Sequence, residues 1–164
     1  MTKIAQIQSK ILVQPGLNNT LALWRFKGKK IVFTNGCFDL LHPGHIDYLS
    51  RARDLGDILV LGLNSDDSVH RLKGPSRPIL DEKSRALILA SLSFIDAVIL
   101  FDEDTPIDLI RTVMPDVLVK GGDYVAEKVV GYEFVTQHGG QVIILPFLEG
   151  FSTTSIEKKI LSNG

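Results

Sequence analysis

The sequence predicts one doubly wound α/β domain with about five parallel strands and helices on both faces of the sheet. Short apolar runs rich in β-branched residues alternate with helical patterns along the chain. Each run is apolar almost throughout, which is typical of strands buried on both faces of a parallel sheet. A length of 164 residues suits a single domain with its own core.

The expected strands are residues 30–34, 58–63, 97–101, 117–119 and 141–145. Doubly wound sheets bind their ligands beyond the carboxyl ends of the strands, where the strand order reverses. The residues that directly follow each strand are therefore the candidates for a functional site.

Helix signals stand between these runs. Pro43 fits the first turn of a helix, and Gly56 is expected to supply a left-handed stop after Leu55. Asp81 is expected to cap a helix that runs through Leu92.

Further helices are expected in the second half of the chain and near its start. Thr105 and Pro106 are expected to open one helix, and Pro115 is expected to end it. Ile107, Ile110 and Met114 are expected to share the apolar face of this helix. Thr154 with Glu157 three residues later is typical of a capping box that opens a C-terminal helix. We expect residues 1–29 to form an N-terminal extension with one short helix at 18–26, and residues 30–164 to form the main domain.

Composition and charge exclude several classes of protein. With 18 Lys and Arg against 19 Asp and Glu, the formal net charge of −1 leaves no broad cationic surface for coating nucleic acid. The single cysteine, Cys37, cannot form an intramolecular disulfide, which favours the reducing cytoplasm. The longest apolar stretch, residues 142–148, is far shorter than the roughly 20 residues of a membrane-spanning helix, and polar residues near the start interrupt any signal-peptide pattern.

The loop after the first expected strand carries the clearest chemical signal. Residues 34–45 read Thr-Asn-Gly-Cys-Phe-Asp-Leu-Leu-His-Pro-Gly-His and match neither a dinucleotide glycine fingerprint nor a phosphate loop. His42 and His45 flank a helix start, where free N–H groups and the helix dipole favour an anion. Gly44 leaves room for a phosphate, and we expect both imidazoles to be protonated beside a bound polyphosphate.

Two plainer interpretations of the histidines stay open. A zinc site would need a third or fourth ligand, and the sequence places neither His70 nor His138 to complete it. Alternatively, the two rings serve packing alone. Cys37 is expected to be a small filler without chemistry of its own.

Charged and polar residues after the later strands extend the candidate site. Three basic residues without an acidic residue among them are expected on a Gly-Pro loop: Arg71, Lys73 and Arg77. Such a loop suits a triphosphate, and the alternative is a solvated charged loop without a ligand. Asn64 and Asp66 either hydrogen-bond a ribose or cap a helix. Asp39 and Asp123 are expected to accept from sugar hydroxyls, with a turn role as the alternative for Asp123. Ser152 and Thr153 precede the expected cap, so their polar groups should stay available to a nucleotide.

Two segments resemble the signatures of a known superfamily. Residues 36–45 resemble the HxGH signature of the nucleotidyltransferases. Residues 149–156, Glu-Gly-Phe-Ser-Thr-Thr-Ser-Ile, resemble the second signature of their cytidylyltransferase-like group. Each motif is weak alone, but the two occur in the expected order at the ends of one α/β unit. The resemblance covers residues 29–160 and implies a Rossmann-like nucleotidyltransferase domain.

Within that superfamily, residues 34–39, 72–78, 103–106 and 119–124 are similar to the heptose 1-phosphate adenylyltransferases of lipopolysaccharide core synthesis. This resemblance implies transfer of an adenylyl group from ATP, with Mg²⁺, to D-glycero-β-D-manno-heptose 1-phosphate, giving ADP-heptose and pyrophosphate. Phe147-Leu148 stands where glycerol-3-phosphate cytidylyltransferases carry Arg-Thr, which favours ATP. The sugar kinase domain fused to some members has no counterpart here, so we expect the stand-alone form, as a monomer or as the homodimer common among small members.

The resemblance also implies roles for individual residues. The expected catalytic residues are His42, His45 and Lys73. The expected nucleotide-binding residues are Cys37, Phe38, Gly44, Asn64, Asp66, Arg77, Arg85, Gly121, Ser152 and Thr153. The expected sugar-phosphate ligands are Asp39, Lys120 and Asp123. Arg85 matches a family arginine near the phosphates, with an exposed helical charge as the alternative, and no side chain is expected to hold a metal ion.

Three other functions stay open. The nearest is another sugar- or polyol-phosphate nucleotidyltransferase, such as a glycerol-3-phosphate cytidylyltransferase. A fragment of a class I aminoacyl-tRNA synthetase would share the histidine motif, but the chain has no KMSKS-like lysine loop and no basic face. A non-enzymatic α/β binding module leaves the histidine pair unexplained. No nucleic-acid or membrane partner is expected.

Overall fold

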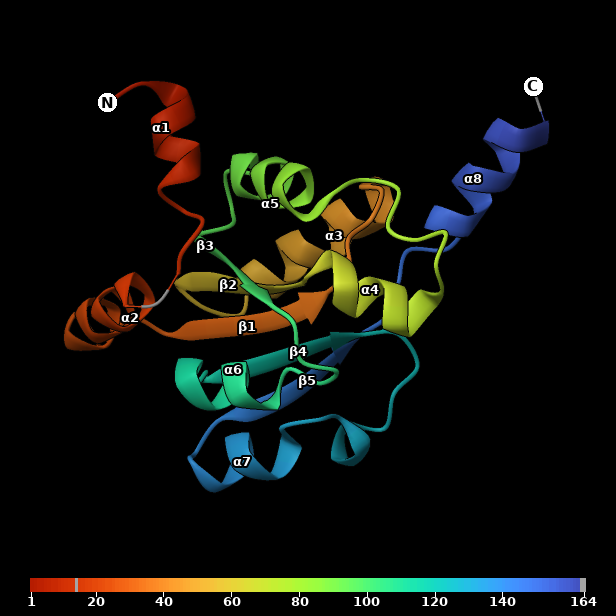
Figure 1. Ribbon diagram of the computed structural model, residues 1–164. Coiled ribbons are helices and arrows are strands. Elements are labelled where there is room, and N and C mark those ends of the chain that lie inside the picture. The colour runs from red at the N-terminus through yellow and green to blue at the C-terminus, as the bar shows by residue number, and fades with distance from the viewer. Residues whose placement is uncertain (14, 163–164) are drawn as a thin grey trace.

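The computed structural model describes residues 1–13 and 15–162, in which a parallel sheet lies between two layers of helices (Figure 1). The five strands have the order β3-β2-β1-β4-β5, and every neighbouring pair is parallel. This is the order of a Rossmann-like doubly wound sheet. The strands are β1 (Ile31–Gly36), β2 (Ile58–Asn64), β3 (Ala97–Phe101), β4 (Val117–Gly121) and β5 (Gln141–Leu145). The predicted fold class is confirmed.

The strand bounds agree with the prediction for β3 and β5 and differ by one or two residues for the others. The first strand runs on through Asn35 and Gly36 because the ladder with β2 continues there, where these residues pair with Gly62 and Leu63. A search for apolar runs stops at the first polar residue. It therefore misses the polar strand ends, which are the part of the sheet that faces the site.

Helices cover both faces of the sheet, each over one apolar cluster (Figure 1). One layer contains α1 (Lys3–Gln8), α3 (Pro43–Arg53) and α5 (Glu82–Ser91). The other contains α2 (Gly16–Phe26), α6 (Ile107–Val113) and α7 (Tyr132–Gln137). The remaining helical elements are α4 (Asp66–Lys73), the 3₁₀ turn η1 (Ala126–Lys128) and α8 (Thr153–Ser162). Among the helices of residues 1–13 and 15–162, none combines the length and apolar character that crossing a membrane requires.

The predicted role of Gly56 is wrong. Helix α3 ends at Arg53, and Gly56 is not among the residues with a positive φ. A Cβ atom at this position would lie 2.7 Å from Val32 Cγ2 and 2.8 Å from the Lys30 carbonyl oxygen. The glycine is therefore required because the chain passes close to the start of β1, and not because it makes a left-handed turn.

The helix starts after β2 and β3 agree only in part with the prediction. The Asp81 carboxylate accepts a hydrogen bond from the Ser84 N–H group at 3.0 Å and caps α5, as predicted. Helix α6 instead has Pro106 at its N-cap and no side-chain hydrogen bond there, so Thr105 does not cap it. Met114 was expected on the buried face, but it ends α6 in a left-handed conformation and is 45% exposed.

The N-terminal segment contributes to the core and to one edge of the sheet. Leu17 and Leu21 of α2 are each 1% exposed and pack in the second apolar cluster. The Leu12 N–H group donates to the Val98 carbonyl at 2.9 Å, and the Val98 N–H group donates to the Lys10 carbonyl at 2.8 Å. These bonds cover the outer edge of β3. The division of the chain at residue 29 stays a prediction.

Candidate active site

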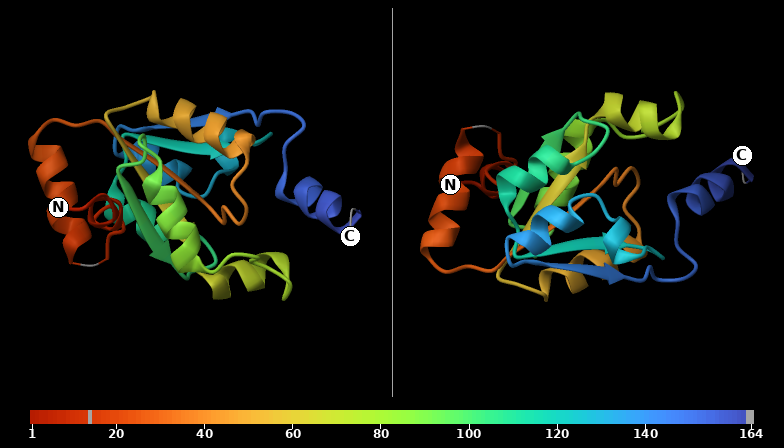
Figure 2. Two further views of the ribbon diagram at one scale, coloured as in Figure 1. Left: turned by 90° about the horizontal axis from the view of Figure 1, so that it is seen from above. Right: turned by 90° about the horizontal axis from the view of Figure 1, so that it is seen from below.

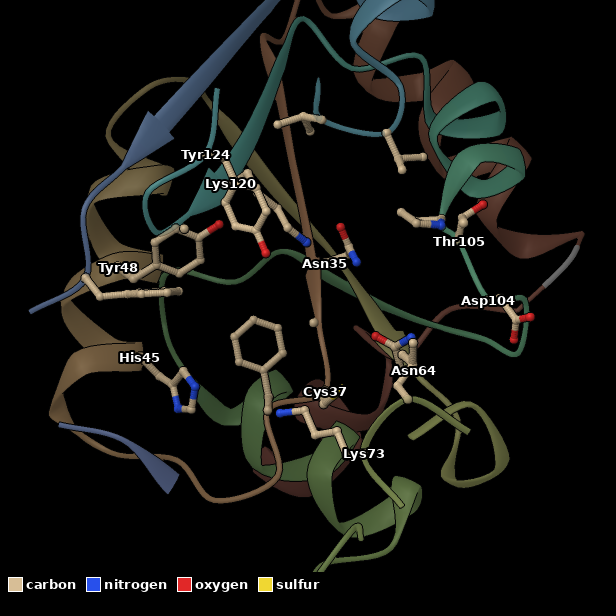
Figure 3. Close-up of a pocket in the computed structure, with 18 of the residues that line it drawn as sticks. Asn35, Cys37, His45, Tyr48, Asn64, Lys73, Asp104, Thr105, Lys120 and Tyr124 are labelled. Carbon is tan, nitrogen blue, oxygen red and sulfur yellow. The ribbon is translucent and has the colours of Figure 1, made fainter. Parts of the chain in front are cut away.

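A cavity of about 560 Å³ opens beyond the carboxyl ends of β1 and β4 (Figure 3). The chain order of the sheet reverses between these two strands, which is where doubly wound sheets bind their ligands. The cavity brings together seven predicted site residues: Cys37, Phe38, His45, Asn64, Lys73, Lys120 and Gly121. The other predicted residues do not line it: Asp39, His42, Gly44, Asp66, Arg77, Arg85, Asp123, Ser152 and Thr153.

A strained turn after β1 shapes the entrance to α3. Phe38 has a φ of 45°, in the left-handed region that a bulky residue rarely adopts. Its ring lies over Gly36, where a Cβ atom would be 2.9 Å from the phenyl carbons. The same ring meets the edge of the His45 imidazole, with ring centroids 5.2 Å apart. The turn therefore places the first turn of α3, and His45 with it, beside the cavity.

The two histidines form a stacked pair at the start of α3. His42 is the N-cap residue, and its ring stacks on that of His45 with centroids 3.8 Å apart and planes inclined by 21°. The Nδ1 atoms of both rings are buried and have no hydrogen-bond partner among the residues that the structure describes. Gly44 lies under the His42 ring, which a Cβ atom there would approach to 3.1 Å. Buried polar atoms without partners are rare and often mark a functional site.

Burial keeps both imidazoles neutral in the free protein. Burial, together with the neighbouring His42, lowers the pKa of His45 to about 4. Burial also lowers the pKa of His42. The expectation of protonated rings concerns the nucleotide-bound state, in which phosphate charge raises the pKa again, and it stays a prediction.

Two lysines approach the cavity from opposite sides (Figure 3). Lys120 lies near the end of β4 with its Nζ atom 5.9 Å from the centroid of the Tyr124 ring, and burial lowers its pKa. Lys73 extends into the cavity from the end of α4. Burial raises the pKa of the Cys37 thiol between them, so this cysteine is no reactive thiolate at neutral pH. The arrangement suits a ligand with two separate anionic groups.

Several lining residues were given no individual role in the sequence analysis. Tyr48 is buried, its hydroxyl lies 2.6 Å from Thr34 Oγ1, and burial raises its pKa to about 12. A Cβ atom at Gly121 would lie 2.4 Å from the Phe147 ring, so the glycine makes room for this aromatic wall. The other missed lining residues with polar side chains are Asn35, Asp104, Thr105, Tyr124 and Lys128. Asn35 directly follows the first expected strand, so it was among the candidate positions but was given no role of its own.

Arg77 and Asp39 bind each other, although they were predicted to hold triphosphate and sugar. Arg77 Nη1 donates to Asp39 Oδ2 at 2.8 Å, and the second arm of the guanidinium pairs with Glu157. Burial alone would raise the pKa of Asp39, but hydrogen bonds from Arg77 and from two backbone N–H groups outweigh it and leave the pKa lowered. Neither side chain lines the cavity.

Arg85 is a buried clamp and not an exposed helical charge. It is 1% exposed and donates to the Cys37 carbonyl at 2.6 Å, the Leu80 carbonyl at 3.0 Å and Asp66 Oδ1 at 2.7 Å. Asp66 is therefore engaged by this arginine and does not face a ribose in this structure. Arg85 holds the loop after β1 against the segment that precedes α5.

Neither Asn64 nor Asp66 caps the helix that follows β2. Ser65 caps α4 by accepting a hydrogen bond from the Ser68 N–H group at 3.1 Å. Asn64 lines the cavity and donates to Ser68 Oγ at 3.0 Å, so its amide is only partly free for a ligand.

The capping box predicted for the C-terminal helix is wrong. The Ser152 hydroxyl accepts from the Ser155 N–H group at 3.0 Å, and the Ser155 hydroxyl accepts from the Ser152 N–H group at 3.2 Å. This reciprocal pair caps α8, so Ser152 is committed to the helix and Thr153 is its first residue. Glu157 pairs with Arg77 instead of closing a box with Thr154.

Two charged residues near the cavity differ in role from the sequence expectation. Arg71 pairs with Asp104 at 2.9 Å and with Asp102, which fastens α4 to the loop after β3. Asp123 is exposed and lies off the cavity wall. Of the three cations predicted on the Gly-Pro loop, Arg71 and Lys73 instead lie in the last turn of α4, and only Lys73 faces the cavity.

Comparisons with known proteins identify relatives that match most of this chain. A bifunctional protein HldE from Syntrophotalea carbinolica is 57% identical over 156 residues, which cover 95% of this chain and 32% of that protein. Bifunctional protein HldE from Geobacter metallireducens is 58% identical over 153 residues, covering 93% of this chain and 31% of that protein. This chain thus spans about a third of the length of these curated relatives.

A solved structure supports the same relationship. The crystal structure of a lipopolysaccharide core biosynthesis protein from Thermoplasma volcanium matches with a TM-score of 0.59 and 34% identity, covering 74% of this chain and 98% of that one. The model of the cytidylyltransferase-like family matches residues 33–159, which include the histidine pair, the basic residues at 71–77 and α8 up to Lys159. The chain therefore belongs to the cytidylyltransferase-like family and is a nucleotidyltransferase.

Proposed function

We propose that this chain transfers an adenylyl group from ATP to D-glycero-β-D-manno-heptose 1-phosphate, giving ADP-heptose and pyrophosphate. The observation that carries the proposal is the stacked histidine pair at a helix start, beside a cavity flanked by lysines. The Nδ1 atoms of this pair have no hydrogen-bond partner in residues 1–13 and 15–162. A solved relative is described as a lipopolysaccharide core biosynthesis protein, and curated relatives are named bifunctional protein HldE. The first description supports an acceptor substrate from lipopolysaccharide synthesis, and heptose 1-phosphate is the acceptor that the sequence resemblance implies.

The reaction we propose is an in-line attack by a phosphate oxygen of the sugar on the α-phosphorus of ATP. A new P–O bond forms to the α-phosphorus, and the bond to the β-phosphate breaks and releases pyrophosphate. The attacking oxygen is already anionic at neutral pH, so no general base and no covalent enzyme intermediate are needed. Catalysis then consists of holding the two substrates in line and stabilising charge on the α-phosphate.

The side chains divide naturally between the two substrates. His42, His45 and Lys73 would stabilise the phosphates of ATP, because they gather at the positive end of α3 and at the end of α4. Lys120, on the other side of the cavity, would hold the sugar phosphate. The nucleotide itself would lie against the loop after β1 and the end of β4, contacting Cys37, Phe38, Asn64 and Gly121.

A divalent metal ion often accompanies the nucleoside triphosphate in such enzymes, and Mg²⁺ is the ion we propose. The residues that the structure describes contain no group of three or more side chains that could hold a metal ion. Asp104, on the cavity wall, is already paired with Arg71. The described part of the chain thus offers no cage for Mg²⁺, whose usual ligands in such sites are substrate phosphates and water.

The compartment and the assembly also belong to this proposal. A free cysteine and an ATP substrate support a cytoplasmic enzyme. A homodimer is compatible with the small size of the chain, and sedimentation would test it.

Pyrophosphate release measured with each of ATP, CTP, GTP and UTP against a panel of sugar and polyol phosphates tests the proposed substrates. We expect ATP with heptose 1-phosphate to give the highest kcat/KM. Preference for CTP with glycerol 3-phosphate would instead identify a glycerol-3-phosphate cytidylyltransferase. Absence of any turnover together with absence of ATP binding in calorimetry would favour a binding module.

A further inference from the structure

One guanidinium group joins three segments that are far apart in the sequence. Arg77 Nη1 donates to Asp39 Oδ2 at 2.8 Å, and Nη2 pairs with Glu157 on α8. The second oxygen of Asp39 accepts from the N–H groups of Ile79 and Leu80 at 2.7 Å and 3.1 Å. The segment after α4, the loop after β1 and the C-terminal helix α8 therefore meet at Arg77.

The Asp39 end of this network is rigid. Asp39 is 3% exposed and stands three residues before His42. Both carboxylate oxygens accept hydrogen bonds, and a buried charge held on both sides is costly to displace. The Asp39–Arg77 pair thus fixes the chain that leads into the histidine pair.

The Glu157 end is the weakly held one. Helix α8 contains no buried residue and projects away from the body of the molecule (Figures 1 and 2). Among the described residues, Glu157 makes the one side-chain hydrogen bond between α8 and any segment beyond the adjoining Ser152. Phe151, just before α8, lies against Gly44 and faces the His42 ring at a centroid distance of 6.4 Å. The placement of Phe151 over His42 therefore depends on how α8 is held.

We propose that Arg77 and Glu157 are positioning residues, which dock α8 so that the segment before it closes over the histidine pair. The two residues act through His42 and touch no reacting atom, which replaces the phosphate-binding role predicted for Arg77. Lysine would be a poor replacement for Arg77, because its single ammonium nitrogen lacks the planar fork whose two nitrogens donate to Asp39 and Glu157. The kinetic test of this inference rests on the proposed function, whereas its test by hydrogen exchange does not.

Loss of the Glu157 charge should reduce the fraction of free enzyme in which α8 is docked. Apparent affinity falls in proportion to that fraction, whereas the saturated enzyme is already docked. We therefore expect Glu157→Gln to raise the KM for ATP about fivefold to tenfold and to leave kcat within about twofold of wild type. Glu157→Asp keeps the charge on a shorter arm and should give an intermediate KM.

Hydrogen exchange supplies a readout that does not depend on turnover. In Glu157→Gln, amides of α8 and of residues 38–45 should exchange faster than in wild type, while those of β1 and β2 should not change. Glu133→Gln is the matched control, since Glu133 lies exposed on α7 and off the cavity wall. It should match wild type in KM, kcat and exchange.

Two results would overturn the positioning role. One is a Glu157→Gln variant with the KM and exchange of Glu133→Gln. The other is a fall in kcat with an unchanged KM, which would mean that Glu157 acts on the reaction itself. If wild-type protein does not turn over heptose 1-phosphate, the proposed function fails, but exchange and the ATP affinity from calorimetry still decide the role of Glu157.

Discussion

His42 and His45 share one stacked contact, so a change to either ring alters the surroundings of the other. Neither ring belongs to the two apolar clusters that form the core. Their removal should therefore affect the reaction far more than the fold. The rings form no hydrogen bond through Nδ1 within the described residues, and we propose a bound phosphate as their partner.

We expect His42→Ala and His45→Ala each to lower kcat by about 10²-fold or more, the loss typical of one transition-state donor. Steady-state pyrophosphate release measures kcat, and circular dichroism checks that the fold is kept. His138→Ala is the control, because His138 is an exposed histidine at the end of α7, away from the cavity. Wild-type activity in either site variant would refute the assignment of the pair.

The lowered pKa of His45 makes stability depend on pH in a defined direction. An unfolded histidine protonates near pH 6.5, whereas folded His45 protonates near pH 4. Between these values the unfolded state binds a proton that the folded state does not, so stability falls as pH falls from about 6.5 to about 4. Denaturant unfolding across this range should show a smaller loss in His45→Gln than in wild type. Parallel curves for the two proteins would mean that His45 is not buried in its neutral form.

Sequence reasoning at the residue scale identified the groups but not their partners. The sequence placed Asp39 in the anion-binding loop and Arg77 in a basic segment, and the family resemblance implied that Arg85 lies near the phosphates. It did not show that Arg77 binds Asp39 or that Arg85 binds Asp66 and a carbonyl of the loop after β1. The partner of a charge depends on three-dimensional distances across segments that are far apart in the chain.

Among the elements, the passage from α3 to β2 depends on one glycine. A side chain at Gly56 would meet Val32 and the Lys30 carbonyl below 3.0 Å, and the backbone oxygen cannot move aside. We expect Gly56→Ala to reduce the free energy of unfolding by about 1–3 kcal/mol, as overpacking typically does. Urea unfolding measures the change.

Gly16→Ala is the matched control for Gly56→Ala. A Cβ atom at Gly16 has no neighbour within 4 Å, and Gly16 has no positive φ. The control should be neutral or slightly stabilising, because alanine restricts the unfolded chain. Equal unfolding free energies for the two variants would contradict the close approach at Gly56.

Strands and helices were predictable to different degrees. Apolar runs identify strands, so all five strands were found, but the edge strand β5 contains no fully buried residue, and the polar residues at the strand ends were missed. Helix starts depend on which hydroxyl or carboxylate reaches a free N–H group, and Ser152 and Thr154 both fit that rule. The structure selects Ser152 because Ser155 completes the reciprocal pair and Glu157 is engaged by Arg77.

At the scale of the molecule, the first residues protect an edge of the sheet. The backbone of Lys10 and Leu12 bonds to Val98 on the outer strand β3. We expect a chain without residues 1–12 to be less stable and more prone to aggregate, because the N–H and C=O groups of that edge become unpaired. Thermal unfolding and light scattering would measure both effects. Unchanged values would mean that the bonds of this segment contribute little.

The net charge of the whole chain is slightly negative, whereas the cavity is lined by several lysines. A net charge of −1 excludes a broad nucleic-acid surface, yet Lys73, Lys120 and Lys128 all line one cavity. The fold class was predictable because the strand rhythm fixes a parallel sheet, and the sheet fixes where its ligand binds. The walls of the cavity were not predictable, because two of the side chains that form them come from different segments. Tyr48 reaches the cavity from a face of α3, and Phe147 reaches it from the segment after β5.

Transfer of isotope from the sugar phosphate tests the central claim most directly. The three non-bridging phosphate oxygens of heptose 1-phosphate are labelled with ¹⁸O, the sugar is incubated with ATP and the protein, and the products are analysed by mass spectrometry. Attack on the α-phosphorus predicts ADP-heptose that retains all the label, together with unlabelled pyrophosphate. Release of ADP or AMP with the label on a transferred phosphoryl or pyrophosphoryl product, or no ADP-heptose at all, would contradict it.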